Sequence, residues 1–240
     1  MISKASFSHP STRLLIATCK AEGLLRNQCA YVLATAWHES GRYQYMREIW
    51  GPTAAQRRYE GRADLGNVQK GDGKKFMGRG FCQITGRKNY TDWSRRLGID
   101  LLKEPQLAEK PEIAAKIIVR GMKLGTFTGM KLADYITISR SDFVQARRIV
   151  NGMDRADLIA SYAKDFNALL GDYDAQPEPD LVLQPTPAPV TPPAAPERQP
   201  QPLPAPKPLG KPAAAVGVAA LGIVLATYWH EFTAWLSSLF

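Results

Sequence analysis

The chain has 240 residues, of which 45% are hydrophobic, and a formal net charge of +9 at pH 7. This length predicts one or two domains, and the hydrophobic content suffices for a buried core. The cysteines are odd in number and follow no metal-binding spacing, which indicates neither a disulfide framework nor a zinc site: Cys19, Cys29 and Cys82.

Two helices are predicted in the first 40 residues, and the second has an acidic residue, Glu39, near its end. One helix begins near Pro10 and ends at Gly23. The next spans about residues 27–40, and its apolar face consists of Ala30, Leu33, Ala34 and Trp37. Gly41 allows this helix to end in a left-handed turn, so Glu39 lies in its last turn. A carboxyl group at such a position, beside buried aromatic residues, favours the protonated form that a general acid needs.

A second carboxylate, Glu48, follows nine residues later in an irregular polar segment, where carboxylates stay ionised. Two carboxylates in unlike surroundings are typical of glycosidases. Residues 49–75 then form a long polar loop with one short helix at about 54–59, and loops of this length are often functional. Glu60 in this loop is the alternative second carboxylate.

The remaining elements make the domain mainly α. Residues 76–84 alternate loosely between glycines and predict a small β-hairpin. Further helices are expected at about residues 89–97, 111–124, 131–136, 141–150 and 156–170.

Three short stretches together resemble glycoside hydrolase family 19, which contains chitinases and related phage endolysins. The family's His-Glu-(Ser/Thr)-Gly sequence is matched from His38 to Gly41. Its Gly-Arg-Gly…Gln-(Leu/Ile)-(Thr/Ser)-Gly segment is matched by residues 78–86. Its Asn-Gly-Gly is matched by Asn151 and Gly152, with Met153 in place of the last glycine. The resemblance covers roughly residues 10–170.

The resemblance implies a lysozyme-like helical domain with a small β-hairpin beside the active-site cleft. It implies that Glu39 is the general acid and Glu48 the base, because related phage lysins have their second glutamate at this nine-residue spacing. Thr85 would hold the attacking water. The sugar acetamides and hydroxyls would be bound by Gln83, Asn89 and Asn151. No metal or organic cofactor is implied.

The C-terminal part of the chain differs in composition. Between Pro177 and Pro212 lie 14 of the 18 prolines. We therefore predict a family-19-like domain at 1–172, a disordered Pro/Ala-rich linker at 173–212, a transmembrane helix at 213–229 and a short amphipathic interfacial tail at 230–240. The N-terminal segment lacks the apolar core of a secretory signal peptide, so we expect membrane anchoring through the C-terminal helix, in a host inner membrane or a virion.

Charge is concentrated in the predicted domain. Residues 173–240 hold three basic and five acidic side chains, a net charge of −2, and subtracting this from +9 leaves +11 on residues 1–172. A domain of this charge is attracted to polyanions such as cell-wall polymers or membrane surfaces. No helix-turn-helix, zinc-finger or RNA-binding motif occurs, so we expect no nucleic-acid partner.

These features together predict a membrane-anchored peptidoglycan hydrolase, an endolysin-type N-acetylmuramidase that cleaves β-1,4 glycosidic bonds by inverting acid/base catalysis. Phage or prophage origin is implied by the resemblance. One alternative is a chitinase that acts on β-1,4-linked N-acetylglucosamine. The other is a non-catalytic wall-binding or virion structural protein. The sequence leaves the oligomeric state open.

Overall fold

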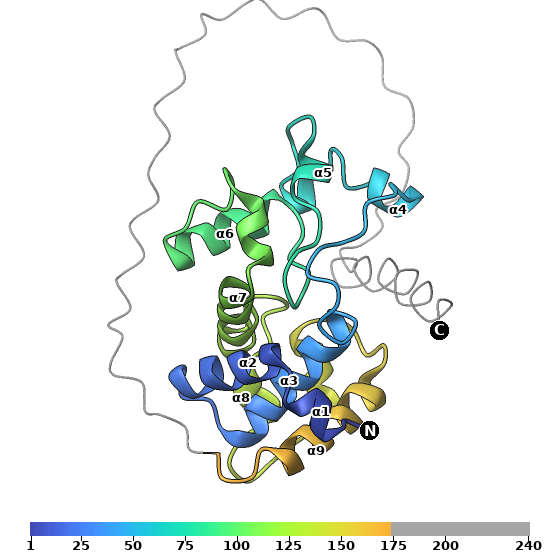
Figure 1. Ribbon diagram of the computed structural model, residues 1–240. Coiled ribbons are helices and arrows are strands. Elements are labelled where there is room, and N and C mark those ends of the chain that lie inside the picture. Colours follow the sequence, from blue (N-terminus) through green and yellow to red (C-terminus); the bar gives the residue numbers. More distant parts are fainter. Residues whose placement is uncertain (174–240) are drawn as a thin grey trace, which may run out of the picture. The chain divides into compact units, whose positions relative to one another are not determined.

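The computed structural model describes residues 1–173, which form helices and turns (Figure 1). The α-helices are α1 (Lys4–Phe7), α2 (Pro10–Ala21), α3 (Arg26–Glu39), α4 (Ala54–Arg57), α5 (Asp72–Lys75), α6 (Arg87–Leu97), α7 (Pro111–Leu124), α8 (Leu132–Tyr135) and α9 (Ala156–Leu169). Between them lie the 3₁₀ helices η1 (Ala63–Leu65), η2 (Pro105–Glu109) and η3 (Gln145–Ile149). The prediction of a mainly α domain is confirmed.

Helix α3 lies in the larger hydrophobic core, where it packs against α9 and α2. Residues 29–36 of this helix are all buried, which explains why the sequence is apolar on every side of it. The hydroxyl of Thr35 donates a hydrogen bond to the carbonyl of Tyr31 at 2.9 Å, so this polar group is satisfied. Glu39 ends the helix and is also buried, so its carboxylate needs a partner within the protein.

A smaller hydrophobic core forms around α6, with Tyr90 and Trp93 buried on its inner face. Helix α7 contributes to both cores, because Ile118 belongs to the larger and Ile117 to the smaller. In Figure 1, α4, α5 and α6 gather at one end of the described part, while α1, α2, α3, α8 and α9 gather at the other. Residues 77–86 directly precede α6. This segment runs where the two cores meet, because Phe81 belongs to the larger core and Ile84 to the smaller.

The predicted β-hairpin at 76–84 is wrong as a pair of strands. The described residues contain no strand, and this segment forms only isolated antiparallel bridges, Arg79 with Ile84 and Arg47 with Arg79. The physical reason is backbone conformation, because Gly80 has φ = 80° and Gln83 has φ = 50°. Left-handed residues this close together turn the chain after one bridge and prevent a ladder from extending.

Among residues 1–173, no helix is long and apolar enough to cross a membrane. The predicted membrane span at 213–229 lies outside the described residues, as do the interfacial tail and nearly all of the predicted linker. These remain predictions.

Candidate active site

Glu39, the last residue of α3, forms a buried ion pair with Arg147 of η3. Nη1 of Arg147 donates to Oε1 of Glu39 at 2.5 Å, and the two side chains are 1% and 3% exposed. Nε of Arg147 donates to the carbonyl of Asp154 at 3.0 Å, while Nη2 has no hydrogen-bond partner within the described part of the chain. The pair thus fixes the orientation of Glu39 and leaves one buried donor unused.

The chain leaves α3 through a tight left-handed turn. Gly41, Arg42 and Tyr43 have φ values of 55°, 61° and 68°. This conformation is unfavourable for Arg42 and Tyr43, so the surroundings must stabilise it. The hydroxyl of Ser40 accepts a hydrogen bond from the amide of Tyr43 at 2.9 Å, and the Tyr43 ring packs edge-on against Phe81. The turn directs residues 44–48 along segment 77–86.

Neutral groups surround the Glu39–Arg147 pair. Burial lowers the pKa of His38, while the negative charge of Glu39 raises it and the positive charge of Arg147 lowers it. Nε2 of His38 is buried and has no hydrogen-bond partner among residues 1–173. Burial raises the pKa of the Cys82 thiol, and the negative charge of Glu39 adds to this effect. Cys82 packs against both hydrophobic cores.

Glu48 accepts hydrogen bonds from three donors. Its Oε1 accepts from Nε2 of Gln56 at 3.0 Å and from the hydroxyl of Tyr59 at 3.2 Å. Its Oε2 accepts from the amide of Gly78 at 3.0 Å. The donors come from two separate parts of the chain, the loop after Glu48 and the glycine-rich segment, so they hold the carboxylate in one orientation.

Gly78 lies between Glu48 and Gln83. A Cβ atom at position 78 would lie 2.8 Å from Oε1 of Gln83 and 3.4 Å from Oε2 of Glu48, so only glycine fits there without displacement. Nε2 of Gln83 donates to the carbonyls of Gly80 at 2.8 Å and Tyr45 at 3.1 Å. Segment 77–86 therefore contacts Glu48 directly through the amide of Gly78, and its Cys82 packs against the larger core to which α3 belongs.

Glu48 opens onto a pocket of about 540 Å³. The pocket is lined by Gln44, Tyr45, Met46, Arg47, Glu48, Ile49, Trp50, Lys74, Met77 and Glu109. Glu109 is paired with Arg79, whose Nε lies 2.8 Å from Oε1 of Glu109. Glu39 does not line this pocket.

Sequence comparisons identify relatives with glycosidase names. No family model matches the chain. An endochitinase of Arabidopsis thaliana is 34% identical over 97 residues, which are 39% of this chain and 34% of the endochitinase. A Haemophilus influenzae protein described as glycosyl hydrolase family 19 domain-containing is 32% identical over 104 residues, 43% of this chain and 46% of that protein. The chain thus spans less than half the length of these curated relatives.

Structural comparisons find the same group. A chitinase C variant has 21% sequence identity and a TM-score of 0.53, with 74% of this chain and 95% of that chain covered. Chitinase C from Streptomyces griseus has 20% identity and a TM-score of 0.51, with 74% and 79% covered. At this level of identity, the matches show a shared fold. The resemblance to glycoside hydrolase family 19 is confirmed.

The other predicted site residues of this family-19-like domain form local hydrogen bonds. The hydroxyl of Thr85 donates to the carbonyl of Gln83 at 3.0 Å, and Nδ2 of Asn89 donates to the carbonyl of Thr85 at 2.7 Å. Hydrogen bonds thus link Gln83, Thr85 and Asn89 to one another, and none of the three lines the pocket beside Glu48. Asn151 follows η3 on the Glu39 side, where its Oδ1 accepts from the amide of Gly152 at 2.9 Å.

Glu60, the alternative second carboxylate, accepts hydrogen bonds from backbone amides. Its two carboxylate oxygens accept from the amides of Gly71 at 2.5 Å and Gly73 at 2.9 Å. A Cβ atom on Gly73 would lie 2.8 Å from the Glu60 amide nitrogen, so the contact depends on glycine. This arrangement closes the loop on itself. Glu48 also has protein donors, but it lines the pocket and Glu60 does not, which favours Glu48 as the second carboxylate.

Arg147 is the residue of the site that sequence reasoning missed. It lies 108 positions from Glu39, in a stretch that also contains the exposed Arg148. The available signal was weak: a basic residue between the apolar Ala146 and Ile149, shortly before Asn151. Within residues 1–173, no group of three or more His, Cys, Asp or Glu side chains is placed to hold a metal ion.

Proposed function

We propose that the family-19-like domain is a peptidoglycan hydrolase that cleaves β-1,4 glycosidic bonds as an N-acetylmuramidase. The observation that carries this proposal is that two carboxylates of the domain lie in unlike surroundings, each held by contacts within the protein. Glu39 is buried in an ion pair with the guanidinium of Arg147, whereas Glu48 lines a pocket. Pairs of carboxyl groups in contrasting environments supply the acid and the base of glycosidases.

Glu39 would act as the general acid and give its proton to the leaving glycosidic oxygen. In the structure, its carboxylate accepts a hydrogen bond from Arg147, so the acid role requires this contact to open when the sugar chain binds. Arg147 is held separately through Asp154, which lets the guanidinium stay in place while Glu39 rotates.

Glu48 would act as the base that removes a proton from the attacking water. An inverting enzyme needs room for this water between its carboxyl groups, about 6.5–9.5 Å apart. Thr85 would help to hold the water, since a hydroxyl that donates to a carbonyl can still accept a hydrogen bond. Gln83, Asn89 and Asn151 would bind the acetamide and hydroxyl groups of the sugars.

Charge at the pocket favours peptidoglycan over chitin. Arg47 and Lys74 line the pocket, are exposed and form no ion pair with another described residue. Of the two acidic residues of the pocket, Glu109 is paired with Arg79, and Glu48 is hydrogen-bonded to neutral donors, so the two cations outnumber the one carboxylate without an ion pair. Peptidoglycan carries carboxylates on its peptides, whereas chitin is uncharged, so the free cations fit the first polymer.

Chitinase activity is the second candidate, and the names of the endochitinase relatives favour it. A non-catalytic wall-binding protein is the third. An endolysin role in a phage or prophage, and anchoring through residues 213–229 in a host inner membrane or virion, belong to the same proposal and rest on the sequence.

The test is a parallel digestion of purified peptidoglycan and chitin by the full-length chain, with identification of the new reducing ends. We expect muramic acid ends from peptidoglycan, formed with inversion at the anomeric carbon, and slower cleavage of chitin. Glu48→Gln should abolish the activity on both polymers. Lys74→Gln should raise KM for peptidoglycan and leave KM for chitin oligomers unchanged. Faster cleavage of chitin would favour the second candidate, and cleavage of neither would favour the third.

A further inference from the structure

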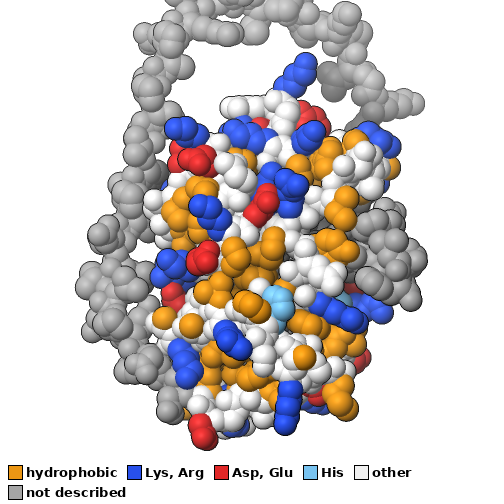
Figure 2. Space-filling view, viewed as in Figure 1, with side chains coloured by type: hydrophobic (Ala, Val, Ile, Leu, Met, Phe, Trp, Pro, Cys, Tyr) orange, Lys and Arg blue, Asp and Glu red, His pale blue; other side chains and the backbone are white. Residues whose placement is uncertain are grey.

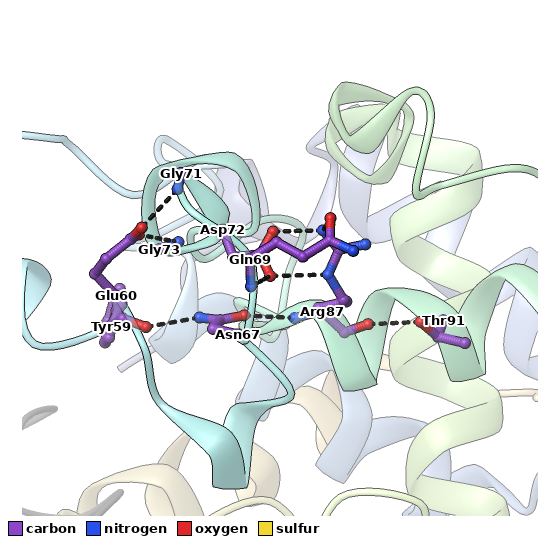
Figure 3. Close-up of polar contacts among 9 residues, drawn as sticks. All are labelled: Tyr59, Glu60, Asn67, Gln69, Gly71, Asp72, Gly73, Arg87 and Thr91. Atoms are coloured by element: carbon purple, nitrogen blue, oxygen red, sulfur yellow. Dashed lines mark hydrogen bonds and ion pairs between the residues drawn. The ribbon is translucent and has the colours of Figure 1, made fainter. Parts of the chain in front are cut away.

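The loop that follows Glu48 is folded around two carboxylates, and neither belongs to the proposed chemistry. Glu60 closes one turn of the loop through backbone amides, and Asp72 closes the next (Figure 3). Asp72 is 2% exposed and forms an ion pair with Arg87, the first residue of α6. Nε of Arg87 donates to one oxygen of Asp72 at 2.8 Å, and Nη2 donates to the other at 2.5 Å. This two-point contact ties the loop to α6.

Asn67 lies at the centre of this loop and is fully buried. Its Oδ1 accepts from the amide of Arg87 at 2.8 Å. Gly86, the residue before α6, has no side chain to cap the helix, so Asn67 caps it from a distant part of the chain. Its Nδ2 donates to the carbonyl of Tyr59 at 2.9 Å (Figure 3). One amide side chain thus joins the start of α6 to the backbone of Tyr59.

Tyr59 completes the connection, because its hydroxyl donates to Oε1 of Glu48 at 3.2 Å. A continuous series of contacts therefore runs from Asp72 through Arg87, Asn67 and Tyr59 to Glu48. The loop also fits closely against α6: a Cβ atom on Gly86 would lie 2.7 Å from the carbonyl oxygen of Leu65.

We propose that Asn67, held by Arg87 and Asp72, is a positioning residue that fixes Tyr59 and thereby orients the carboxylate of Glu48. This inference rests on the proposed role of Glu48 as base. A base works only when its oxygen, the water and the anomeric carbon are aligned, and a small displacement lowers the rate of the chemical step. Since Asn67 lies away from the pocket, losing it should affect kcat and leave substrate binding intact.

The test is a double-mutant cycle in the full-length chain with Tyr59→Phe and Asn67→Ala. Tyr59→Phe removes the hydroxyl that contacts Glu48 and keeps the ring. Each single variant should lower kcat by roughly tenfold or more, with KM changed by less than about twofold. The double variant should be no slower than the slower single variant, because both act through the same contact. Thr91→Val is the matched control, since its hydroxyl bonds to the Arg87 carbonyl on the side away from Tyr59, and its kcat should equal that of the wild type.

An unchanged kcat per folded molecule in Asn67→Ala would overturn the inference, as would losses that multiply in the double variant. If Asn67→Ala does not fold, Asp72→Asn takes its place in the cycle. This change keeps the shape of Asp72 and an acceptor for the amide of Gln69, and it weakens the ion pair with Arg87. The kcat of Asp72→Asn and the kcat of its double variant with Tyr59→Phe then decide in the same way. Failure of the proposed function is distinct: the wild type would cleave neither polymer, or Glu48→Gln would remain fully active.

Discussion

At the residue scale, Glu39 depends on a partner that is itself buried. Removing one member of a buried ion pair leaves the other charge uncompensated, which typically costs about 3–5 kcal/mol. In Glu39→Gln the amide oxygen can still accept from Arg147, so the loss should lie near the lower end of this range. We therefore expect Glu39→Gln to lower the midpoint of urea unfolding and to reduce kcat by orders of magnitude.

A second variant separates these two effects. In Glu39→Gln/Arg147→Met the buried charge is gone, so the unfolding midpoint should recover part of the loss, whereas kcat should stay low. Circular dichroism during unfolding and an assay of reducing ends measure the two quantities. Wild-type activity in folded Glu39→Gln would show that Glu39 is not the acid.

At the scale of an element, the loop at 59–73 depends on the Asp72–Arg87 ion pair. Hydrogen bonds from Arg87 lower the pKa of Asp72 from its ordinary value of 3.8, against the opposing effect of burial. The folded state therefore binds a proton at Asp72 less readily than the unfolded state. The stabilisation is complete above about pH 4 and is lost as the pH falls through the lowered value.

Replacing Asp72 should remove that pH dependence. We expect Asp72→Asn to cost about 2 kcal/mol of unfolding free energy at pH 7, the value of hydrogen bonds to a charged group, and to cost progressively less below pH 4. Asp64→Asn is the matched control in the same loop, because Asp64 pairs with Arg62 at the surface and is 49% exposed. A pH profile of unfolding in which both variants behave alike would contradict the assignment.

The elements that were predicted correctly have local signals at both ends. The helix from Pro111 ends before Gly125, as expected from a proline at its first position and a glycine after its last. The helix that carries Glu39 was predicted within one residue at each end. Residues 141–150 were expected to form an α-helix and instead contain the 3₁₀ helix η3, from Gln145 to Ile149. Its basic residues Arg147 and Arg148 face different surroundings, which no local pattern encodes.

The site could be predicted only as far as its residues lie in recognisable motifs. Glu39, Gln83 and Asn151 were assigned to the candidate site in this way, and their roles stay predictions. The contacts that hold the carboxylates join distant positions, as in Arg147 with Glu39 or Asn67 with Tyr59. Such pairings depend on the packing of η3 and the loop, and a single sequence contains no periodicity that specifies them.

At the scale of the whole molecule, charge should govern binding to walls. Figure 2 shows Lys and Arg side chains spread over the visible face and not confined to one patch. Residues 1–172 carry +11. Exposed charges are screened beyond about 8 Å at physiological ionic strength and about 3 Å at 1 M salt. We expect the fraction of protein that pellets with cell walls to fall steeply between these salt concentrations.

Walls with amidated carboxylates are the control and should show weak binding at every salt concentration. A flat salt profile on native walls would remove charge as the targeting principle.

The C-terminal sequence yields the last prediction. Residues 213–229 are 17 uncharged residues, near the lower limit for a membrane-spanning helix, and a charged residue at the centre of such a helix costs about 2.5–3.5 kcal/mol. We expect the full-length chain to float with lipid vesicles in a density gradient and Leu221→Arg to float much less, because position 221 is the centre of the predicted span. Leu181→Arg adds the same charge within the predicted linker and should float like the wild type. If the wild-type chain stays in the aqueous fraction, or if Leu221→Arg floats as well as Leu181→Arg, then residues 213–229 do not insert. A difference between these two arginine variants would assign the membrane contact to the span, since both change net charge equally.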